Sequence, residues 1–470
     1  MNTSRASTYP SDAAAPIDRK TWRMCWVVVF GAFVSGLDAS LVNIGLDIIS
    51  RDLQASLGVT QWVASAYLLS LGLSLPLAGW LSRRFGTGRV WLTALATFTV
   101  ASGLCALAPN IGLLIAARVL QGLAGGVLIP AGQTLLGQAV GPARLGRVMG
   151  TLGIAVSAAP AIGPLVGGLL LHSLPWPWLF LINLPIGAIG LILGRRYVPQ
   201  GNPSATTSID KTGLALITIG IPLVVFAVTQ WGTSGTISAS TAALAAIGII
   251  ALAWFVAHER RATHPLLDVR LYRNPGYRAG VIAAAFSGAL VFGSGIVQTL
   301  YFQIGRHLAT IQAGLSLLGV AGATVVFAPL AGRWIDRYGP AKVSLIGSTI
   351  AVATTGPFIA LPIDASGWIV QPLLTVYGAA VAMVATPANV AAYKAVIADQ
   401  LPDAITQVNI VQRIGGSLGG AICAVLIASR LPNTTAAFHT AFAALTICAV
   451  GALAGATLIH RTTHRQGKNQ

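Results

Sequence analysis

Charged residues are scarce in this chain of 470 residues. Asp, Glu, Lys and Arg together make up 9% of it, whereas 55% of the residues are hydrophobic. A soluble globule of this size would have to cover its surface with far more polar groups than these. The composition therefore excludes the water-soluble classes of protein, and most side chains must face lipid or one another.

Cysteine is also rare, and all four residues lie within apolar runs: Cys25, Cys105, Cys423 and Cys448. We expect them to be small packing residues, with neither a disulfide nor a metal site. The sequence has no HExxH, no paired-Asp motif, no Ser/His/Asp grouping and no glycine-rich ATP-binding loop. We therefore expect no enzyme activity, no metal and no cofactor, and any pumping must draw on an ion gradient.

Long apolar runs, in contrast, are abundant. Runs of roughly 18 or more residues recur along the chain, and each can cross the ~30 Å hydrocarbon layer of a bilayer. They lack the two-residue alternation of barrel strands, so we predict an all-α polytopic membrane protein. We expect fourteen transmembrane helices, near 24–49, 60–81, 90–109, 111–138, 148–171, 178–194, 213–230, 238–257, 279–303, 311–332, 343–362, 367–393, 406–428 and 437–459.

The net charge is +17, and the distribution of the basic residues agrees with the predicted topology. Most of the 29 Lys and Arg fall in the tails and loops of one side, whereas only Arg51, Arg306 and Arg430 fall on the other. By the positive-inside rule both termini are cytoplasmic, in the cell inner (plasma) membrane. The basic charge thus reflects topology and does not predict a nucleic-acid partner.

One loop sequence occurs twice. "GWLSRRFGTGRVWL" begins at Gly79 and "GRWIDRYGPAKVSL" begins at Gly332, each in the cytoplasmic loop after the second helix of a six-helix set. A duplicated six-helix unit is the plan of transporters that hold substrate between their halves. The predicted units are a tail (1–22), a first bundle (23–197), linkers with two extra helices (198–277), a second bundle (278–460) and a tail (461–470).

These loops and several further motifs resemble the major facilitator superfamily, and specifically its fourteen-helix drug:proton antiporters. The motifs are "LDASLVN" at Leu37, "RVLQGLAGG" at Arg118, "PAIGPLVGG" at Pro160, "WLFLINLPIG" at Trp178, "HPLLDVRLYRN" at His264 and "RIGGSLGG" at Arg413. The resemblance implies a proton-coupled secondary exporter of hydrophobic or amphipathic compounds. We expect neutral or cationic small molecules as substrates, protons and the lipid bilayer as the other partners, and a monomer. The alternatives are an exporter of one metabolite, lipid or endogenous antibiotic, and, further off, a channel or a membrane-embedded enzyme.

Asp38 is the main candidate for the proton-carrying group. An ionised carboxylate is costly in hydrocarbon, so an acid near the middle of a span predicts function, and Asp38 lies roughly 16 Å from the outer end of its helix. Arg118, roughly 11 Å deep, is close enough in depth to pair with it. The resemblance assigns both residues to proton coupling. Asp47 lies about two turns further out and is expected at the interface.

Two further sets of residues are expected to act in conformational change. Proline removes a backbone donor and glycine permits close helix contact, so one set predicts a hinge or a seam between the halves: Pro160, Gly163, Pro164, Gly167 and Gly168. The other set comprises the cytoplasmic latch motifs: Gly79, Arg83, Arg84, Gly86, Gly332, Asp336, Arg337 and Gly339. Arg83 stands where the family usually has an acidic residue, which puts the latch of the first half in doubt.

The substrate cavity is the least specified part of the sequence. Polar, amphipathic or basic residues on helices are its candidates, with Phe286 and Phe292 as additional aromatic walls. The candidates are Trp62, Tyr67, Gln121, Gln133, Gln298, Gln303, Asn409 and Arg413. Most such residues in any membrane bundle only bridge helices.

Overall fold

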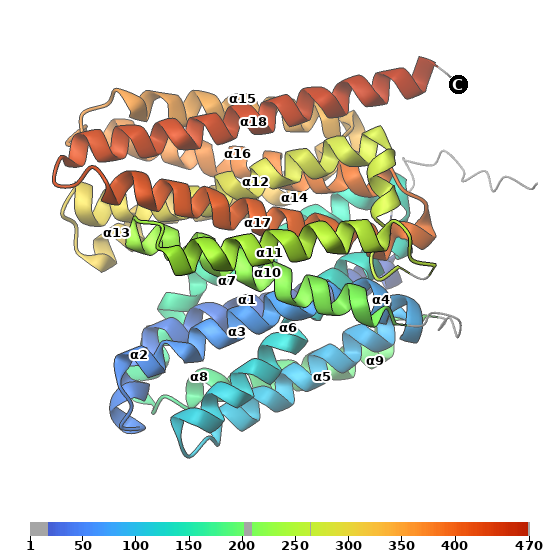
Figure 1. Ribbon diagram of the computed structural model, residues 1–470, viewed down its shortest axis with the longest axis horizontal. Coiled ribbons are helices and arrows are strands. Elements are labelled where there is room, and N and C mark those ends of the chain that lie inside the picture. Colours follow the sequence, from blue (N-terminus) through green and yellow to red (C-terminus); the bar gives the residue numbers. More distant parts are fainter. Residues whose placement is uncertain (1–16, 202–208, 264, 469–470) are drawn as a thin grey trace, which may run out of the picture.

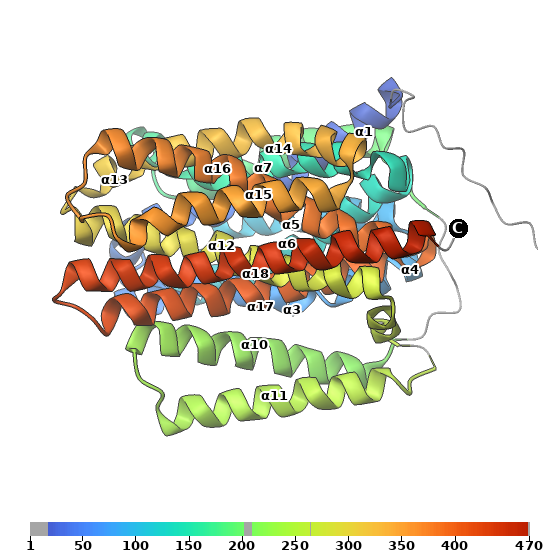
Figure 2. The ribbon, with the colours of Figure 1, turned by 90° about the horizontal axis from the view of Figure 1, so that it is seen from above.

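The structure, a computed structural model, describes residues 17–201, 209–263 and 265–468. Within these ranges every regular element is helical, and the long helices run roughly side by side (Figures 1 and 2). Twelve helices in the described part are long and apolar enough to cross a membrane, or thirteen if one bent pair counts as a span. The chain is therefore a multi-pass membrane protein, whereas the expected count of fourteen spans is not confirmed.

The first half of the chain folds into one bundle. Its helices are α1 (Arg19–Asp52), α2 (Leu57–Thr60), α3 (Trp62–Ser74), α4 (Leu77–Phe85), α5 (Thr87–Ala106), α6 (Ile111–Val140), α7 (Leu145–Ser173), α8 (Trp178–Leu181) and α9 (Asn183–Tyr197). The span predicted near 60–81 is bent by 57° between α3 and α4. Pro76 lies at this bend, where it cannot donate to the helical hydrogen-bond ladder.

A helical hairpin joins the two halves. Its arms, α10 (Lys211–Ser234) and α11 (Ala239–Glu259), form one edge of the molecule in Figure 2. α10 packs against α17 (Leu401–Ala428) of the second half and, less extensively, against α3 of the first. Glu259 ends α11 as a buried residue and accepts a hydrogen bond of 3.3 Å from the amide of Leu267.

The second half forms a similar bundle. Its helices are α12 (Pro275–Leu300), α13 (Thr310–Ser316), α14 (Leu318–Tyr338), α15 (Pro340–Thr355), α16 (Gly367–Lys394), α17 (Leu401–Ala428) and α18 (Thr434–Lys468). Short helical turns lie between the long helices of both halves and before α12: Pro142–Arg144, Val269–Arg273, Tyr301–Gly305, Gly356–Ile359 and Ala398–Gln400. α18 continues through 461–468, a region we expected to be a separate tail.

Polar residues at helix starts account for many of these boundaries. The side chains of Asp18, Asn110 and Ser238 accept hydrogen bonds from the first-turn amides of α1, α6 and α11. Asn274 likewise accepts from two amides at the start of α12. Such caps satisfy backbone amides that have no partner inside the helix. These four helices therefore begin directly after a short polar residue.

The two halves touch through α7 and α14 on one side, and through α4, α6 and α17 on the other. Close contacts between the halves lie where α7 and α17 begin. There Gly146 of α7 meets Gly332 of α14, and Gly79 of α4 meets Asp403 of α17. Figure 1 shows the first half diverging from the second toward the opposite end, near α2 and α13.

Candidate functional site: a buried carboxylate and arginine

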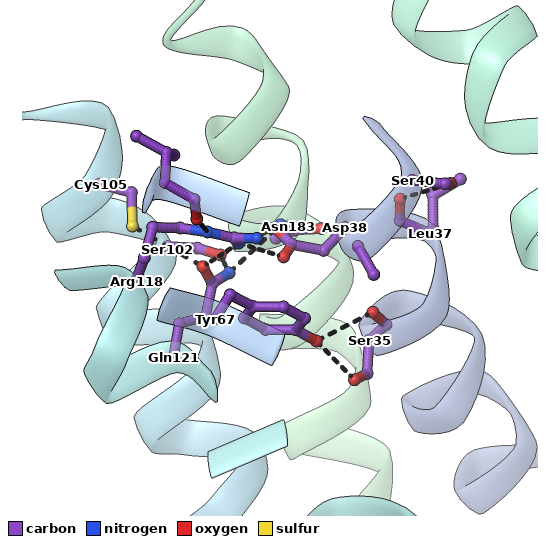
Figure 3. A network of polar contacts seen from close by, with 12 residues as sticks. Ser35, Leu37, Asp38, Ser40, Tyr67, Ser102, Cys105, Arg118, Gln121 and Asn183 are labelled. Atoms are coloured by element: carbon purple, nitrogen blue, oxygen red, sulfur yellow. Dashed lines mark hydrogen bonds and ion pairs between the residues drawn. The ribbon is translucent and has the colours of Figure 1, made fainter. Parts of the chain in front are cut away.

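The structure brings Asp38 and Arg118 together in the core of the first half (Figure 3). An Arg118 Nη1 atom lies 2.5 Å from Oδ2 of Asp38, and the two side chains are 1% and 0% exposed. Asp38 lies on α1 and Arg118 lies on α6. Their depths in the two helices, estimated from the sequence, are thus compatible with direct contact.

Other polar side chains complete the surroundings of the carboxylate. Gln121 and Asn183 donate to Asp38 Oδ1 from their amide nitrogens, at 3.0 and 2.7 Å. Ser102 of α5 accepts from the same two amides, at 2.6 and 3.0 Å. We expected Gln121 in the substrate cavity, but it is fully buried in this network.

Arg118 is fixed on its other sides as well. It donates to the carbonyl of Val63 at 3.0 Å and to Gln121 Oε1 at 2.7 Å. The ring centroid of Tyr67 lies 4.1 Å from the guanidinium carbon, in a cation–π contact. The Tyr67 hydroxyl in turn bonds to Ser35, so the aromatic ring is held in place from α1.

The arrangement suits an ionised Asp38. Every group that contacts its two oxygens within the described chain donates a hydrogen bond or carries a positive charge. A buried ion pair is tolerated only when further hydrogen bonds satisfy both partners. Protonation of Asp38 would weaken its attraction to Arg118, so one proton can change how α1 and α6 are held together.

Asp47 lies in a different setting. It is exposed near the end of α1 and pairs with Arg51 at 2.7 Å, one turn away. A pair in such a setting is only weakly stabilising. Asp47 therefore serves as a matched control for Asp38 on the same helix.

Two glycines of the expected hinge or seam, Gly163 and Gly167, pack against α1 within the first half. A Cβ atom at Gly163 would meet Ser40 of α1, and one at Gly167 would meet Ile44 and Leu41. Gly168 has no atom within 4 Å, and the side chains of Pro160 and Pro164 lie outside the described residues. Gly163 and Gly167 therefore lie against α1, the helix that carries Asp38, and not against the second half, whereas the hinge stays a prediction.

The second latch motif joins the halves through a helix end. Asp336 of α14 accepts hydrogen bonds from the amides of Gly146 and Arg147, at 2.8 and 3.0 Å. These amides belong to the first turn of α7, where a negative charge is favourable. Gly339, which follows α14, has a φ of +85°, and Arg337 lies over the ring of Tyr338 at 5.2 Å.

In the first latch motif the residue that corresponds to Asp336 is basic. Arg83 of α4 forms an ion pair with Asp403, which lies in the first turn of α17, and also donates to the carbonyl of Leu266. The acid that the family usually carries on α4 is thus supplied by α17 itself. Gly79 lies against Asp403, and Gly86 has a φ of +88°, similar to Gly339 in the second copy. Arg84, which follows Arg83, also makes a noncovalent interaction and is not free.

Only some of the cavity candidates line the space between the halves. Gln133, Asn409, Arg413 and Phe292 do so. The others lie elsewhere in the described structure: Trp62 and Phe286 are more than one-third exposed, Tyr67 contacts Arg118, Gln298 is buried in α12, and Gln303 follows α12. A polar or aromatic residue in a span does not by itself show which face it occupies.

The structure also offers little for a metal. In residues 17–201, 209–263 and 265–468 no group of three or more His, Cys, Asp or Glu side chains could hold an ion. The four cysteines are free thiols, three of them buried.

Comparison with known proteins assigns the family. The model of the Major Facilitator Superfamily matches residues 28–422. The chain belongs to this superfamily. The resemblance expected from its motifs is thereby confirmed.

Two curated relatives of this superfamily member are drug exporters or resistance proteins by name. The Multidrug resistance protein B homolog of Mycobacterium tuberculosis is 33% identical over 86% of this chain and 76% of its own length. The Tetracenomycin C resistance and export protein of Streptomyces glaucescens is 30% identical over 89% of this chain and 78% of its own. The proton:xylose symporter XylE, at 13% identity and a TM-score of 0.63, covers 94% of this chain and 95% of that structure, and shows the fold alone.

Proposed function

We propose that this protein is a proton-coupled exporter of hydrophobic or amphipathic compounds, working by alternating access. The observation that carries the proposal is the sealed Asp38–Arg118 pair at the centre of the first half. A carboxylate held by a guanidinium in a low-dielectric site can take up a proton only when the site opens to water. Proton uptake is then coupled to a change in helix packing, which is what an antiporter requires.

The proposed topology has fourteen crossings. The span that is not among the twelve or thirteen counted helices is α7, whose 29 residues suffice to cross a bilayer. Both ends of the described chain then lie in the cytoplasm, the protein is a monomer of the inner membrane, and the proton gradient is its energy source. The contacts at Gly146–Gly332 and Gly79–Asp403 close the cytoplasmic side, so the structure corresponds to a state closed to the cytoplasm.

In this state Asp38 has the contacts of the deprotonated form. Entry of a proton from outside weakens the ion pair and frees α1 and α6 to shift. The cytoplasmic contacts then open, and the proton leaves Asp38 toward the cytoplasm as Arg118 returns to it. Substrate moves in the opposite direction through the space between the halves.

The first latch motif permits a test of the closed state. Arg83→Asp places two acids together at the start of α17, and we expect this repulsion to shift the equilibrium toward the cytoplasm-open state by about 1–3 kcal/mol. Arg83→Asp combined with Asp403→Asn recreates the acid-at-helix-start arrangement of Asp336, so closure should return. The distance between spin labels at the exposed residues Ala143 and Ala398, which lie on opposite halves, reports whether the cytoplasmic side is open or closed. Equal distances in the single and double variants would contradict this role.

Transport by purified protein in liposomes tests the proposed function. A pH gradient is imposed, and internal pH is followed together with the movement of ethidium, 5-dimethylaminonaphthalene-1-sulfonate (dansylate) or tetracenomycin C. At least one compound should move against its gradient while protons flow down theirs, and a proton ionophore should stop both. If the pH gradient changes the movement of none of the three compounds, proton-coupled export is refuted.

A narrow-specificity exporter of one natural product is the second candidate. It is favoured by the relative that is named for tetracenomycin C export. Transport of that compound alone would support it over a broad substrate range.

A further inference from the structure

A cavity of about 270 Å³ lies between the two halves. α6 and α7 line it on one side, and α12, α14, α16 and α17 on the other. Gln133 and Asn409 connect the halves at its wall through a hydrogen bond of 2.7 Å. Apolar groups such as Leu152 and Phe292 make up much of the rest, so the cavity suits an amphipathic organic molecule.

Arg413 of α17 is the only charged residue among the described residues that line this cavity. Its side chain is half-buried, and within the described chain no hydrogen bond or ion pair engages its guanidinium. Arg118, the other arginine within a membrane span, has an ion pair, two further hydrogen bonds and an aromatic ring. The two intramembrane arginines therefore differ sharply in how their charge is compensated.

The carboxylates that could compensate Arg413 are engaged elsewhere. Asp38 is sealed in the core of the first half with Arg118. Asp336, on the cavity-lining helix α14, binds the start of α7, and Asp403, on the same helix as Arg413, pairs with Arg83. The interior between the halves thus carries one positive charge with no acid to match it.

The chemistry of arginine makes this imbalance informative. A guanidinium does not lose its proton in a protein, so it cannot become neutral to avoid burial. A charge in a membrane interior is costly unless an opposite charge or several acceptors contact it. Its planar set of donors fits a carboxylate, a sulfonate or a similar oxyanion.

We propose that Arg413 is a substrate-binding residue, and that the preferred substrates are amphipathic molecules with an anionic group beside an apolar body. The inference rests on the proposed export function and specifies its substrate class. It replaces the neutral or cationic class that we expected from the sequence.

An electrical consequence follows from this substrate class. Export of a monovalent anion in exchange for an entering proton moves positive charge inward twice, whereas exchange of a monovalent cation for a proton moves no net charge. An interior-negative membrane potential should therefore stimulate export of an anion.

Three dansyl compounds of similar shape test the inference by binding. They are dansylate, which is permanently anionic, neutral dansylamide, and the cationic (2-dansylamidoethyl)trimethylammonium. Equilibrium dialysis against purified protein in nanodiscs should give dansylate an affinity about tenfold higher than that of dansylamide, and the cationic compound should bind no more tightly than dansylamide. Arg413→Gln should bring the two affinities to within about twofold, and Arg413→Lys should retain part of the preference. Arg430→Gln, which removes an exposed positive charge outside this cavity, should leave the ratio unchanged.

Transport in liposomes separates failure of this inference from failure of the proposed function. If the pH gradient drives ethidium but not dansylate, and the parent binds dansylamide as tightly as dansylate, the inference is wrong while proton-coupled export stands. If no compound responds to the gradient, the exporter proposal fails, and the binding ratio still decides the role of Arg413. An unchanged ratio in both Arg413 variants would also overturn the inference.

Discussion

Asp38→Asn is expected to abolish gradient-driven export, reducing it to the level of protein-free liposomes. Asparagine is close in size to aspartate, so the bundle should still fold, but it can neither take up a proton nor pair with Arg118 as an anion. Substrate binding should change by no more than about twofold, because Asp38 lies outside the central cavity. Accumulation of ethidium, dansylate and tetracenomycin C under a pH gradient, with binding measured separately, tests both parts.

The matched control is Asp47→Asn. This residue is exposed near the end of the same helix and pairs only with Arg51 among the described residues, so export should continue at close to the parent rate. If Asp38→Asn still pumps, or if Asp47→Asn fails equally, Asp38 is not the coupling group.

Gly332→Val is expected to reduce turnover by more than about tenfold, because the protein could no longer close toward the cytoplasm. A Cβ atom at Gly332 would lie 2.5 Å from the carbonyl oxygen of Gly146 and 3.1 Å from the Cα of Gly150. Both neighbours are backbone atoms of α7, so no side chain can rotate away to make room. The distance between labels at Ala143 and Ala398 should increase, and transport should fall with it.

Gly322→Val provides the control on the same helix. Gly322 also lies in α14, but a Cβ atom there would have no neighbour within 4 Å. Its replacement should leave both the label distance and the transport rate near those of the parent. If the label distance in Gly332→Val equals that of the parent, the proposed role of the interface between α7 and α14 is contradicted.

The parts of the fold that could be predicted from the sequence depend on local and additive properties. Hydrophobic length indicates helices, and charge asymmetry indicates topology, because both follow from the bilayer itself. Asp38 and Arg118 could be paired because a charge in an apolar span needs a partner and depth follows from helix rise. The bend near Pro76 was not foreseen, since proline in a membrane helix is compatible with several local geometries.

The rest of the site depends on contacts between helices that spacing within one helix cannot reveal. Asn183 and Ser102 complete the carboxylate's surroundings, but neutral polar residues in spans are common and usually bridge helices. The Arg83–Asp403 pair joins residues 320 positions apart. Its only signal was a basic residue where an acid is usual, together with an acid at the start of a later helix. For the same reason, Trp62 could not be assigned to an exposed face in advance.

Difference infrared spectroscopy of the purified protein tests the central claim most directly, because it detects protonation of carboxylates without requiring a known substrate. Acidification should produce a carbonyl band of a protonated, buried carboxylic acid in the parent and in Asp47→Asn. In Asp38→Asn the contribution of Asp38 to this band should be missing, whereas the contribution of other buried acids, such as Asp336 and Asp403, should remain. A band that persists unchanged in Asp38→Asn would show that the proton resides on another group, and would contradict the assignment of Asp38 as the proton carrier.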